Sequence, residues 1–383
     1  ELTKNPIYSS TAVVLKQYIK TKKNGRQYSV LKLRDMKGFI FYTTSYEPLR
    51  DLKMHQVDIA LLAKDITFLQ TLQNFYVPSF NIRVHPREPS LRRTIYNAIA
   101  IQHSDANLAS LFSALFIATP LEKEMRNSVT LLGTAHLTAL SGYHLGLLST
   151  ILFFLLKLIY SPFHKRYFPF RNIYYDLGAT ILFILLGFVF ISDSPPSLIR
   201  AFVMMFVAFI LLYFWLDIFS FETLAIVIGI ILALFPNLIF SIGFWLSISG
   251  VFYIYLFVQF FKEKKPLWHL FMLNIYLYFA LIPIVHTIFP SFALSQLLSI
   301  PLSLLFTLFY PIEIFLHLIG FGNLLDSPLK ILFDFHSDTK EITTPLWFLI
   351  LYLVSSLVAM FRKEAFYFTL FLMILFYLFA LLS

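Results

Sequence analysis

The chain has 383 residues, of which 58% are hydrophobic and 13% are charged, and its mean hydropathy is +0.74. A soluble domain contains about 25% charged residues, so this composition excludes a water-soluble protein that buries its apolar residues in one core. Cysteine is absent, which excludes a disulfide framework and a thiolate metal site. The composition therefore predicts a polytopic α-helical membrane protein.

Charge is divided unequally along the chain. Residues 1–105 hold 16 Lys and Arg against 8 Asp and Glu, a net of +8 out of +9 for the whole chain. This excess indicates a surface that faces water, lipid headgroups or a polyanion. Residue 1 is Glu rather than Met, and no signal peptide is visible, so we expect the sequence to begin inside a longer protein.

Residues 1–75 are predicted to form a small, basic, soluble domain. β-Branched and aromatic residues predict strands at 7–19, 26–34, 39–44 and 57–63. Asn24-Gly25 lies between the first two runs and indicates a hairpin, because both residues tolerate the positive φ of a tight turn. Four or five short strands fit a small β-barrel of the OB type, an SH3-like barrel or a plain meander.

The first predicted hairpin interleaves cations with aromatic residues. Its cations are Lys16, Lys20, Lys22, Lys23, Arg26, Lys32 and Arg34, and the tyrosines among and near them are Tyr8, Tyr18, Tyr28 and Tyr42. Single-stranded nucleic acid is bound by cations along its backbone and aromatic faces against its bases. This pattern predicts a DNA-binding site at Lys20, Lys22, Lys23 and Arg26. The alternative is that the tyrosines only pack and the lysines only solubilise the hairpin.

Residues 76–132 are predicted to be a linker followed by an interfacial helix. The stretch 75–105 contains three prolines and four arginines, which is typical of an extended basic connection. Residues 107–121 are apolar but shorter than the roughly 20 residues that a spanning helix needs. We therefore expect a helix at the membrane surface that ends at Pro120.

Residues 133–383 are predicted to form the membrane domain, because they consist of apolar runs with short breaks. The expected spans, about eight in number, are 135–158, 173–192, 196–216, 219–235, 238–261, 266–289, 345–361 and 365–382.

Positive loops predict the orientation of these spans. Basic residues gather at 157–171, 262–265 and 362–363, and loops rich in Lys and Arg face the cytoplasm. If all three lie inside, the soluble domain is extracytoplasmic and the run 291–320 must begin and end on the outer face. Because this run is about 30 residues long and contains Pro301 and Pro311, we expect a re-entrant hairpin.

Several polar residues lie inside apolar runs, where an ionisable group costs roughly 2.5–3.5 kcal/mol and usually faces a cavity. The candidates for a channel lining are His136, Ser141, Gly142, His144, Arg200, Gly243, Phe244 and Ser247. His136 and His144 are eight residues apart, which places them on roughly one face of a continuous helix. The alternatives are that the histidines and serines only pack between helices and that Arg200 extends to the interface.

The sequence shows no zinc-type cluster, no Walker loop and no Gly-x-Ser-x-Gly nucleophile elbow. We therefore expect no cofactor, no metal and no enzymatic activity. His103-Ser-Asp105 lies in a polar stretch, and a helix cap is the favoured interpretation.

Three motifs occur in order in the membrane domain. Residues 133–148 read Gly-Thr-Ala-His-Leu-Thr-Ala-Leu-Ser-Gly-Tyr-His-Leu-Gly-Leu-Leu, and residues 196–204 read Pro-Ser-Leu-Ile-Arg-Ala-Phe-Val-Met. Phe235-Pro236 is followed by Ser241-Ile-Gly-Phe-Trp-Leu-Ser247, and a fourth stretch reads Leu298-Ser-Ile-Pro-Leu302. Together these stretches resemble the ComEC family of competence DNA-uptake channels over residues 107–311.

The resemblance implies an OB-like domain before the membrane domain and an inner-membrane channel that carries single-stranded DNA into the cytoplasm during natural transformation. It also implies a periplasmic DNA receptor and a cytosolic translocase as partners, besides DNA and membrane lipids. Many relatives carry a metallo-β-lactamase-like domain after the membrane domain. This chain ends at Ser383 in an apolar run without a His-x-His-x-Asp-His motif, so we expect any such nuclease to be separate or absent.

Two positions depart from the pattern of the family. Ala118-Thr119 stands where a Gly and an acidic residue are often seen, and Gln296 stands where an Asn is often seen. The runner-up function is a transporter of a small or lipid-linked anion, with Arg200 and the two histidines as its site. A third class is a membrane hydrolase that uses Ser141 and His144.

Overall fold

The computed structural model describes residues 7–21, 27–35, 39–46, 52, 55–62, 75–85, 90–214, 220–261, 266–335 and 337–382. The chain divides into two compact units. We call residues 1–90 together with 235–240 the sheet unit, and residues 91–234 together with 241–383 the helical unit.

The sheet unit contains the four strands that the sequence predicts. They are β1 (Ile7–Thr21), β2 (Gln27–Asp35), β3 (Ile40–Ser45) and β4 (Gln56–Leu62). The pairing of β1 with β2 reaches Thr21 opposite Gln27, which confirms the predicted hairpin. The Asn24-Gly25 turn itself lies outside the described residues.

Two further strands extend the sheet beyond the expected boundary at residue 75. The strands β5 (Phe75–Tyr76) and β6 (Ser79–Val84) lie at the two ends of the strand order β5-β3-β2-β1-β4-β6. Only Val77 and Pro78 separate them, and the Thr43 hydroxyl on β3 donates a hydrogen bond of 2.7 Å to Ser79 Oγ. The prediction of a linker from residue 76 was therefore wrong for 76–84, where β6 is extended but pairs with β4.

Residues of β1 to β5 fill the core of the sheet unit, and Ile82 of β6 packs against it. The buried side chains are Ala12, Val14, Leu31, Leu33, Phe41, Leu52, Val57, Ile59, Leu61, Phe75 and Val77. Since all of these residues lie between 12 and 77, the segment 1–90 carries a hydrophobic core of its own.

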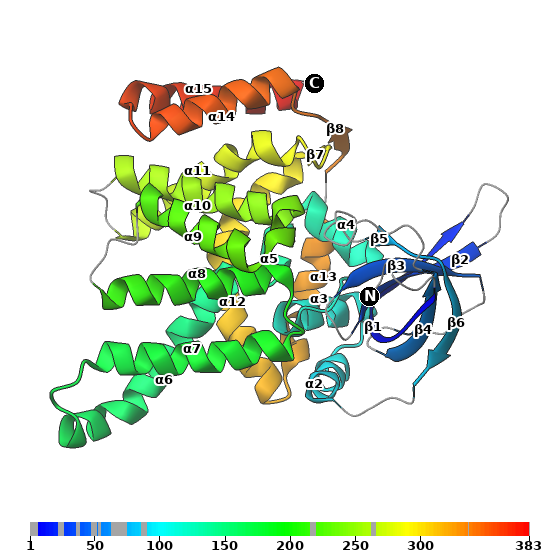
Figure 1. The fold of residues 1–383 in the computed structure, drawn as a ribbon. Helices are drawn as coiled ribbons and strands as arrows, with labels where there is room; N and C mark the ends of the chain where they lie inside the picture. The colour runs from blue at the N-terminus through cyan, green and yellow to red at the C-terminus, as the bar shows by residue number, and fades with distance from the viewer. Residues whose placement is uncertain are drawn as a thin grey trace. The chain divides into compact units, whose positions relative to one another are not determined.

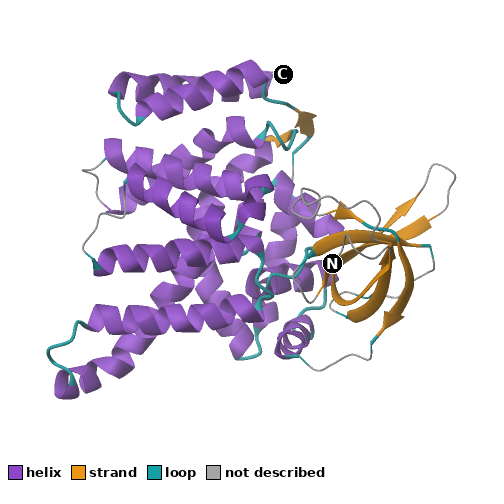
Figure 2. Ribbon diagram, in the orientation of Figure 1, coloured by secondary structure: helices purple, strands orange, loops and turns teal. Residues whose placement is uncertain are grey.

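The helical unit accounts for the apolar runs (Figure 2). Its α-helices, in chain order, are α2 (Leu91–Ala100), α3 (Ala106–Ile117), α4 (Lys123–Leu131), α5 (Ala135–Thr138), α6 (Gly142–Tyr167), α7 (Ile173–Ile191), α8 (Pro196–Tyr213), α9 (Phe221–Leu234), α10 (Ile242–Phe260), α11 (Pro266–Val285), α12 (Ser299–Leu318), α13 (Asp326–Asp334), α14 (Leu346–Ala359) and α15 (Lys363–Leu382). Short elements join them: η2 (Leu294–Leu298), η3 (Gly322–Leu325), β7 (Ser291–Ala293) and β8 (Thr339–Glu341), while η1 (Pro236–Phe240) belongs to the sheet unit.

Six of the helices described are long and apolar enough to cross a membrane, which confirms a multi-pass membrane protein. They are α6, α7, α10, α11, α12 together with η2, and α15. The apolar helices α9 and α14 have 14 residues each, about 21 Å at 1.5 Å per residue, against roughly 30 Å of hydrocarbon. The expected number of eight spans therefore stays a prediction.

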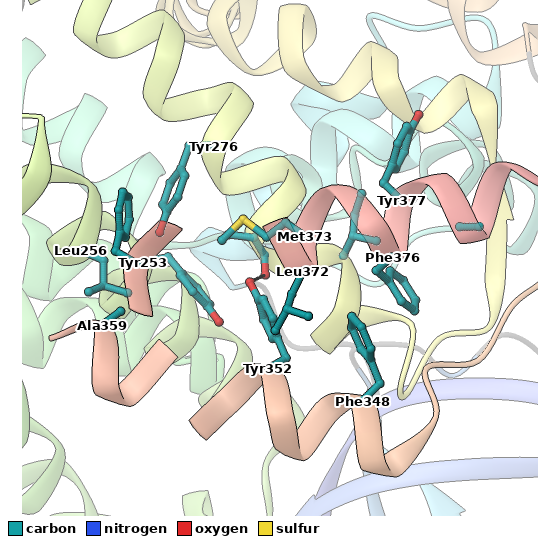
Figure 3. Packing of buried hydrophobic residues seen from close by; sticks show 14 of the residues in the cluster. Tyr253, Leu256, Tyr276, Phe348, Tyr352, Ala359, Leu372, Met373, Phe376 and Tyr377 are labelled. Carbon is teal, nitrogen blue, oxygen red and sulfur yellow. Dashed lines mark hydrogen bonds between the residues drawn. The ribbon is translucent and has the colours of Figure 1, made fainter. Parts of the chain in front are cut away.

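Three apolar clusters hold the helices together. One joins α6, α7 and α8 through Leu145, Leu185 and Leu198. A second joins α10, α11, α14 and α15, and Figure 3 shows its interleaved aromatic rings. There the Tyr352 hydroxyl donates a hydrogen bond of 2.8 Å to the Ala280 carbonyl, so a polar group satisfied inside the cluster ties α14 to α11.

The third cluster corrects the expectation of an interfacial helix at 107–121. The helix α3 ends at Ile117, and its buried residues are Leu108, Ser110, Leu111, Phe112, Ser113, Ala114, Leu115 and Ile117. They pack with residues of α2, α4, α5, α12 and α13. A helix on a membrane surface keeps one polar face open, whereas α3 is an internal helix of the bundle.

The run 291–320 is not a re-entrant hairpin. It contains β7, η2 and one helix, α12, which continues through both prolines. Pro301 lies in the first turn, where the missing N–H has no helical partner to lose, and Pro311 is accommodated inside the helix. A proline in an apolar run is therefore an unreliable sign of a chain reversal.

The chain returns to the beginning of this run at residues 339–342, so the expectation that 291–320 itself starts and finishes on one face stays a prediction. β7 pairs with β8, with Ser291 opposite Glu341 and Ala293 opposite Thr339. The Ile342 N–H also donates to the Pro290 carbonyl at 2.8 Å, so the end of α11 meets the approach to α14. In Figure 1 the α6–α7 and α14–α15 connections, although far apart, both lie on the left side of the helical unit, whereas this ladder lies on its right side.

We predict that cysteines introduced at Ser291 and Ser327 react from the same side of the membrane. Ser327 is exposed at the start of α13, and α13 leads within a few residues to β8, which pairs with residues 291–293. Because the protein has no cysteine, impermeant maleimides report single sites.

The matched control is a cysteine at Phe170, fully exposed in the α6–α7 connection, which should react from the opposite side. Opposite-side labelling of Ser291 and Ser327 would show that α12 crosses the membrane.

Candidate functional site

One face of the sheet unit carries cations and tyrosines in cross-strand register. On β2, the side chains of Tyr28, Lys32 and Arg34 are partly exposed, while Leu31 and Leu33 point into the core. Strand alternation therefore places the first three on the outer face. Lys20 of β1 lies opposite Tyr28.

The third strand extends the same face. Tyr42 lies opposite Lys32, and the Lys32 ammonium sits 5.5 Å from the centre of the Tyr42 ring. The ring centres of Tyr28 and Tyr46 are 5.9 Å apart. On β5, Tyr76 pairs with Tyr42, and its hydroxyl lies 2.8 Å from Thr44 Oγ1. Tyr46 and Tyr76, both exposed, also belong to this face, and the sequence did not predict them because only strand register places them there.

Of the four cations assigned to DNA, Lys20 is exposed at the end of β1 with its ammonium 5.8 Å from the Tyr18 ring centre. Lys22, Lys23 and Arg26 lie outside the described residues. Burial, followed by the like charge of Arg34, lowers the pKa of Lys32. A bound phosphate would offset both effects.

In the helical unit, the expected helix over 135–158 is broken, so His136 and His144 do not share a face. Helix α5 ends at Thr138, Ala139 and Ser141 are extended, and α6 begins at Gly142. His136 is exposed, and its Nε2 lies 3.2 Å from Ser303 Oγ on α12. The prediction that the two histidines share a face was wrong, because their eight-residue spacing has that consequence only in one continuous helix.

His144 instead caps the helix on which it lies. Its Nδ1 accepts a hydrogen bond of 3.3 Å from the Ser141 N–H, and the Ser141 hydroxyl is 3.2 Å from the same nitrogen. The ring is fully buried against Phe306 and Tyr310 of α12, with centroid distances of 5.2 and 4.9 Å. Since its ring is closed off from solvent, His144 positions the start of α6.

Arg200, in contrast, is brought together with residues of the other two motifs. Its guanidinium is buried in the first turns of α8 and donates a hydrogen bond of 3.0 Å from Nη2 to the Gly243 carbonyl. It also lies 6.0 Å from the ring centre of Phe244. No acidic residue among those described pairs with it, and its buried Nε has no hydrogen-bond partner there.

The starts of three helices meet at this arginine. A side chain on Gly142, at the start of α6, would contact Ala201 of α8 at 3.6 Å, and Gly243 lies in the first turn of α10. Helix starts carry partial positive charge, so they add to the arginine in favouring an anion. We call Gly142, Arg200, Gly243 and Phe244 the arginine site. Ser247 is exposed one helical turn beyond Gly243.

The two positions that depart from the family pattern are also explained. Ala118 ends α3 with φ of 57°, in the left-handed region that favours glycine. The Gln296 side-chain amide donates a hydrogen bond of 3.0 Å to the Ser291 carbonyl. A Cβ atom added to Gly133 would lie only 3.0 Å from the backbone oxygen of Gln296. Gln296, which lies shortly before the fourth stretch, therefore packs against the first motif.

A cavity of about 300 Å³ opens beside Ala118. Most residues that line it are small or carry a hydroxyl group, and the latter are Thr119, Thr130, Thr138 and Ser197. Arg126 of α4 also lines the cavity. Thr119 Oγ1 is buried without a partner among the described residues.

A cluster around His103 is a further site in the helical unit that the sequence did not predict. Asp105 does cap α3, as predicted, by accepting from the Asn107 N–H at 2.8 Å. His103 instead lies buried 2.9 Å from Asp326 and 3.0 Å from His317. Its partners are more than 200 positions away, and no local signal marks them.

Residues 118–383, more than half of the chain, match the family described as Competence protein. The chain belongs to the competence protein family. Searches of curated proteins and of solved structures return no match. Membership confirms the resemblance drawn from the motifs and indicates a role in DNA uptake during competence.

We predict that Ala118→Gly stabilises the protein. Glycine at this position should raise the free energy of unfolding by about 1 kcal/mol, because Ala118 has a left-handed backbone conformation in which its Cβ atom clashes with the backbone. The unfolding temperature of the purified protein in detergent should therefore rise.

Ala109→Gly in the middle of α3 is the matched control and should move the unfolding temperature down, since glycine inside a helix costs about 1 kcal/mol. Equal losses in both variants would mean that Ala118 is not strained.

Proposed function

We propose that this protein is an inner-membrane channel that carries single-stranded DNA into the cytoplasm during natural transformation, and that it is not itself an enzyme. The observation that carries the proposal is the cross-strand register of Lys20 with Tyr28 and of Lys32 with Tyr42. Stacking on aromatic rings beside cations is the general mode of binding single strands without sequence preference.

We infer that the sheet unit is an OB-type barrel. If β5 and β6 are counted as one interrupted fifth strand, the neighbouring strands follow the order 1-2-3-5-4, and strand 4 pairs again with strand 1. This order closes the sheet into a barrel. The pairing of β3 with β5 is parallel, that of β1 with β4 is antiparallel, and β1 carries a bulge between Val14 and Lys16. In OB folds the face of strands 2 and 3 and the loop between strands 1 and 2 bind oligonucleotides, and here they hold the tyrosines and Lys22, Lys23 and Arg26.

The arginine site is the proposed contact for DNA phosphates in the membrane domain. A guanidinium with unmet donors and no acidic partner among the described residues suits a phosphate, which it can hold with two parallel hydrogen bonds. Gly142 and Gly243 are exposed beside it, so no side chain from these positions shields it. The hydroxyl-lined cavity extends to Ser197, one helical turn before Arg200.

The orientation that we propose places the basic α6–α7 and α14–α15 connections in the cytoplasm. Lys165, Arg166 and Arg171 lie at or near the first, and Arg362 and Lys363 at the second, which follows the positive-inside rule. The sheet unit is then extracytoplasmic, where a periplasmic receptor would deliver DNA. A cytosolic translocase would supply the energy, and the number of copies in the channel stays open.

A transporter of a small or lipid-linked anion is the second candidate, because the arginine site would suit any phosphate-sized anion. Such a transporter does not require the tyrosine face of the sheet unit. Binding of DNA by that unit therefore separates the two proposals.

We predict that the fragment 1–90, which carries its own core, binds oligothymidylate with strong salt dependence. Tyr28→Ala and Tyr42→Ala should each weaken binding by about 1–3 kcal/mol, roughly 5- to 150-fold, through lost stacking. Reversing Lys20, Lys22, Lys23 and Arg26 to Glu should abolish it. Fluorescence anisotropy measures both.

Tyr28→Phe and Tyr42→Phe keep the rings and should bind like the parent fragment. Unchanged affinity in the alanine and charge-reversed variants would leave this face as a solvated surface.

We predict that Arg200→Ala abolishes transformation although the protein still inserts and accumulates. Since Arg200 has no acidic partner among the described residues, its removal leaves no buried carboxylate unpaired, and we expect the variant to fold. Arg200→Lys should restore transformation in part, because an ammonium keeps the charge and loses the planar fork.

Arg166→Ala, at the other end of the bundle, is the matched control and should transform normally. His144→Ala should also lose transport, but through the start of α6. Normal transformation with Arg200→Ala would remove the arginine site from the DNA path.

A further inference from the structure

Four ionisable side chains of the helical unit form a continuous chain of contacts. Asp326 of α13 lies 2.9 and 3.1 Å from His103 Nδ1 through its two oxygens. His103 Nε2 lies 3.0 Å from His317 Nε2. His317 Nδ1 then lies 2.8 Å from the Glu313 carbonyl and 3.3 Å from Glu313 Oε2 on α12. The order is carboxylate, imidazole, imidazole, carboxylate.

Aromatic rings enclose this chain. Phe112 stacks on His103 at 4.5 Å with an interplanar angle of 3°, and Phe112 and Phe116 lie 4.7 and 4.9 Å from the His317 ring. A side chain at Gly322 would lie 2.7 Å from His317 Nε2, so glycine is needed there. The side chains of His103 and Glu313 are fully buried, whereas that of Asp326 is 15% exposed. The chain therefore leads from the surface into the interior.

The acceptors around the two rings decide which nitrogens carry protons. A carboxylate and a backbone carbonyl can only accept, so Nδ1 of both histidines must be a donor when Asp326 is ionised. Two neutral rings would then place bare Nε2 lone pairs 3.0 Å apart, which is repulsive. A hydrogen bond at this distance requires one additional proton.

We propose that His103 and His317 share one exchangeable proton between their Nε2 atoms, as part of a relay that connects the surface at Asp326 with the buried Glu313. In the relay, His317 takes the shared proton on Nε2 and releases its Nδ1 proton to Glu313 Oε2. In the opposite direction, His103 keeps the shared proton on Nε2 and releases its Nδ1 proton to Asp326 at the surface. Proton number is conserved at each step, and no other reactant is needed.

Glu313 is a suitable end for such a relay. Its side chain is fully buried, and neither carboxylate oxygen makes a well-oriented hydrogen bond to the described residues. A buried unpaired carboxylate is costly, and a proton removes that cost. In membrane proteins, chains of Asp, Glu and His inside the protein commonly carry protons.

The surrounding elements bring few competing charges. Lys330 of α13 lies 4.0 Å from Asp105 at the surface, and α3 presents Phe112 and Phe116 to the cluster. Gln102, after α2, accepts from the Gly322 N–H at 2.8 Å and donates to the His317 carbonyl at 3.2 Å. Among the described residues, no group of three His, Asp or Glu is placed to hold a metal.

The test is nitrogen NMR of the full chain with ¹⁵N-labelled histidine in lipid nanodiscs. Near neutral pH, we expect both Nδ1 atoms to be protonated and one proton to be shared by the two Nε2 atoms. His103→Gln or His317→Gln should remove that signal, and His164→Gln, at the exposed end of α6, should not. Two independent neutral rings in the parent protein would overturn the proposal, whatever the variants do.

Stoichiometric zinc in the purified protein that depends on both histidines would replace the proton with a metal and overturn the assignment.

Discussion

A buried cation without an acidic partner must be satisfied by backbone groups, and much of the helical unit is arranged around that requirement. The Arg200 guanidinium finds the Gly243 carbonyl at 3.0 Å, which fixes the start of α10 against α8. Gly142 lets α6 approach Ala201 on the neighbouring position of α8. The close approach of three helix starts follows from small residues at these positions, and it concentrates partial positive charge where the arginine already lies. This environment favours an anion.

Much of this arrangement could be read from the sequence because the signals are local. Strand alternation, the Asn-Gly turn and the apolar runs predicted β1 to β4 and the long helices, and the three motifs pointed to Arg200 and Gly243. Local signals failed where neighbours decide the structure. The apolar run at 135–158 contains Ser141-Gly142, and a serine that can cap a helix there starts a new one, so His136 and His144 separate. Pro311 stayed inside α12 because the surrounding helix tolerates one missing hydrogen bond.

The remaining misses are contacts between distant parts of the chain. The end of the sheet unit was placed too early because prolines and arginines at 78–87 resemble a linker, and only pairing with β4 shows that 79–84 is a strand. His103 was assigned to a cap together with Asp105, and its partners on α12 and α13 come from the far end of the sequence. No periodicity connects residues separated by more than 200 positions.

One helix connects both polar regions of the helical unit. Along α12, polar side chains recur on one face at Ser299, Ser303, Thr307, Tyr310, Glu313 and His317, while Leu305, Leu308, Ile312 and Phe315 are exposed on the other. The polar face contacts His136 through Ser303, Tyr143 through Thr307, His144 through Tyr310, and His103 through His317. Such a face would be costly in lipid, so α12 has to lie against α3, α5 and α6. The same contacts position the start of α6 beside Ala201, the neighbour of Arg200, so α12 connects the cluster around His103 with the arginine site through packed side chains.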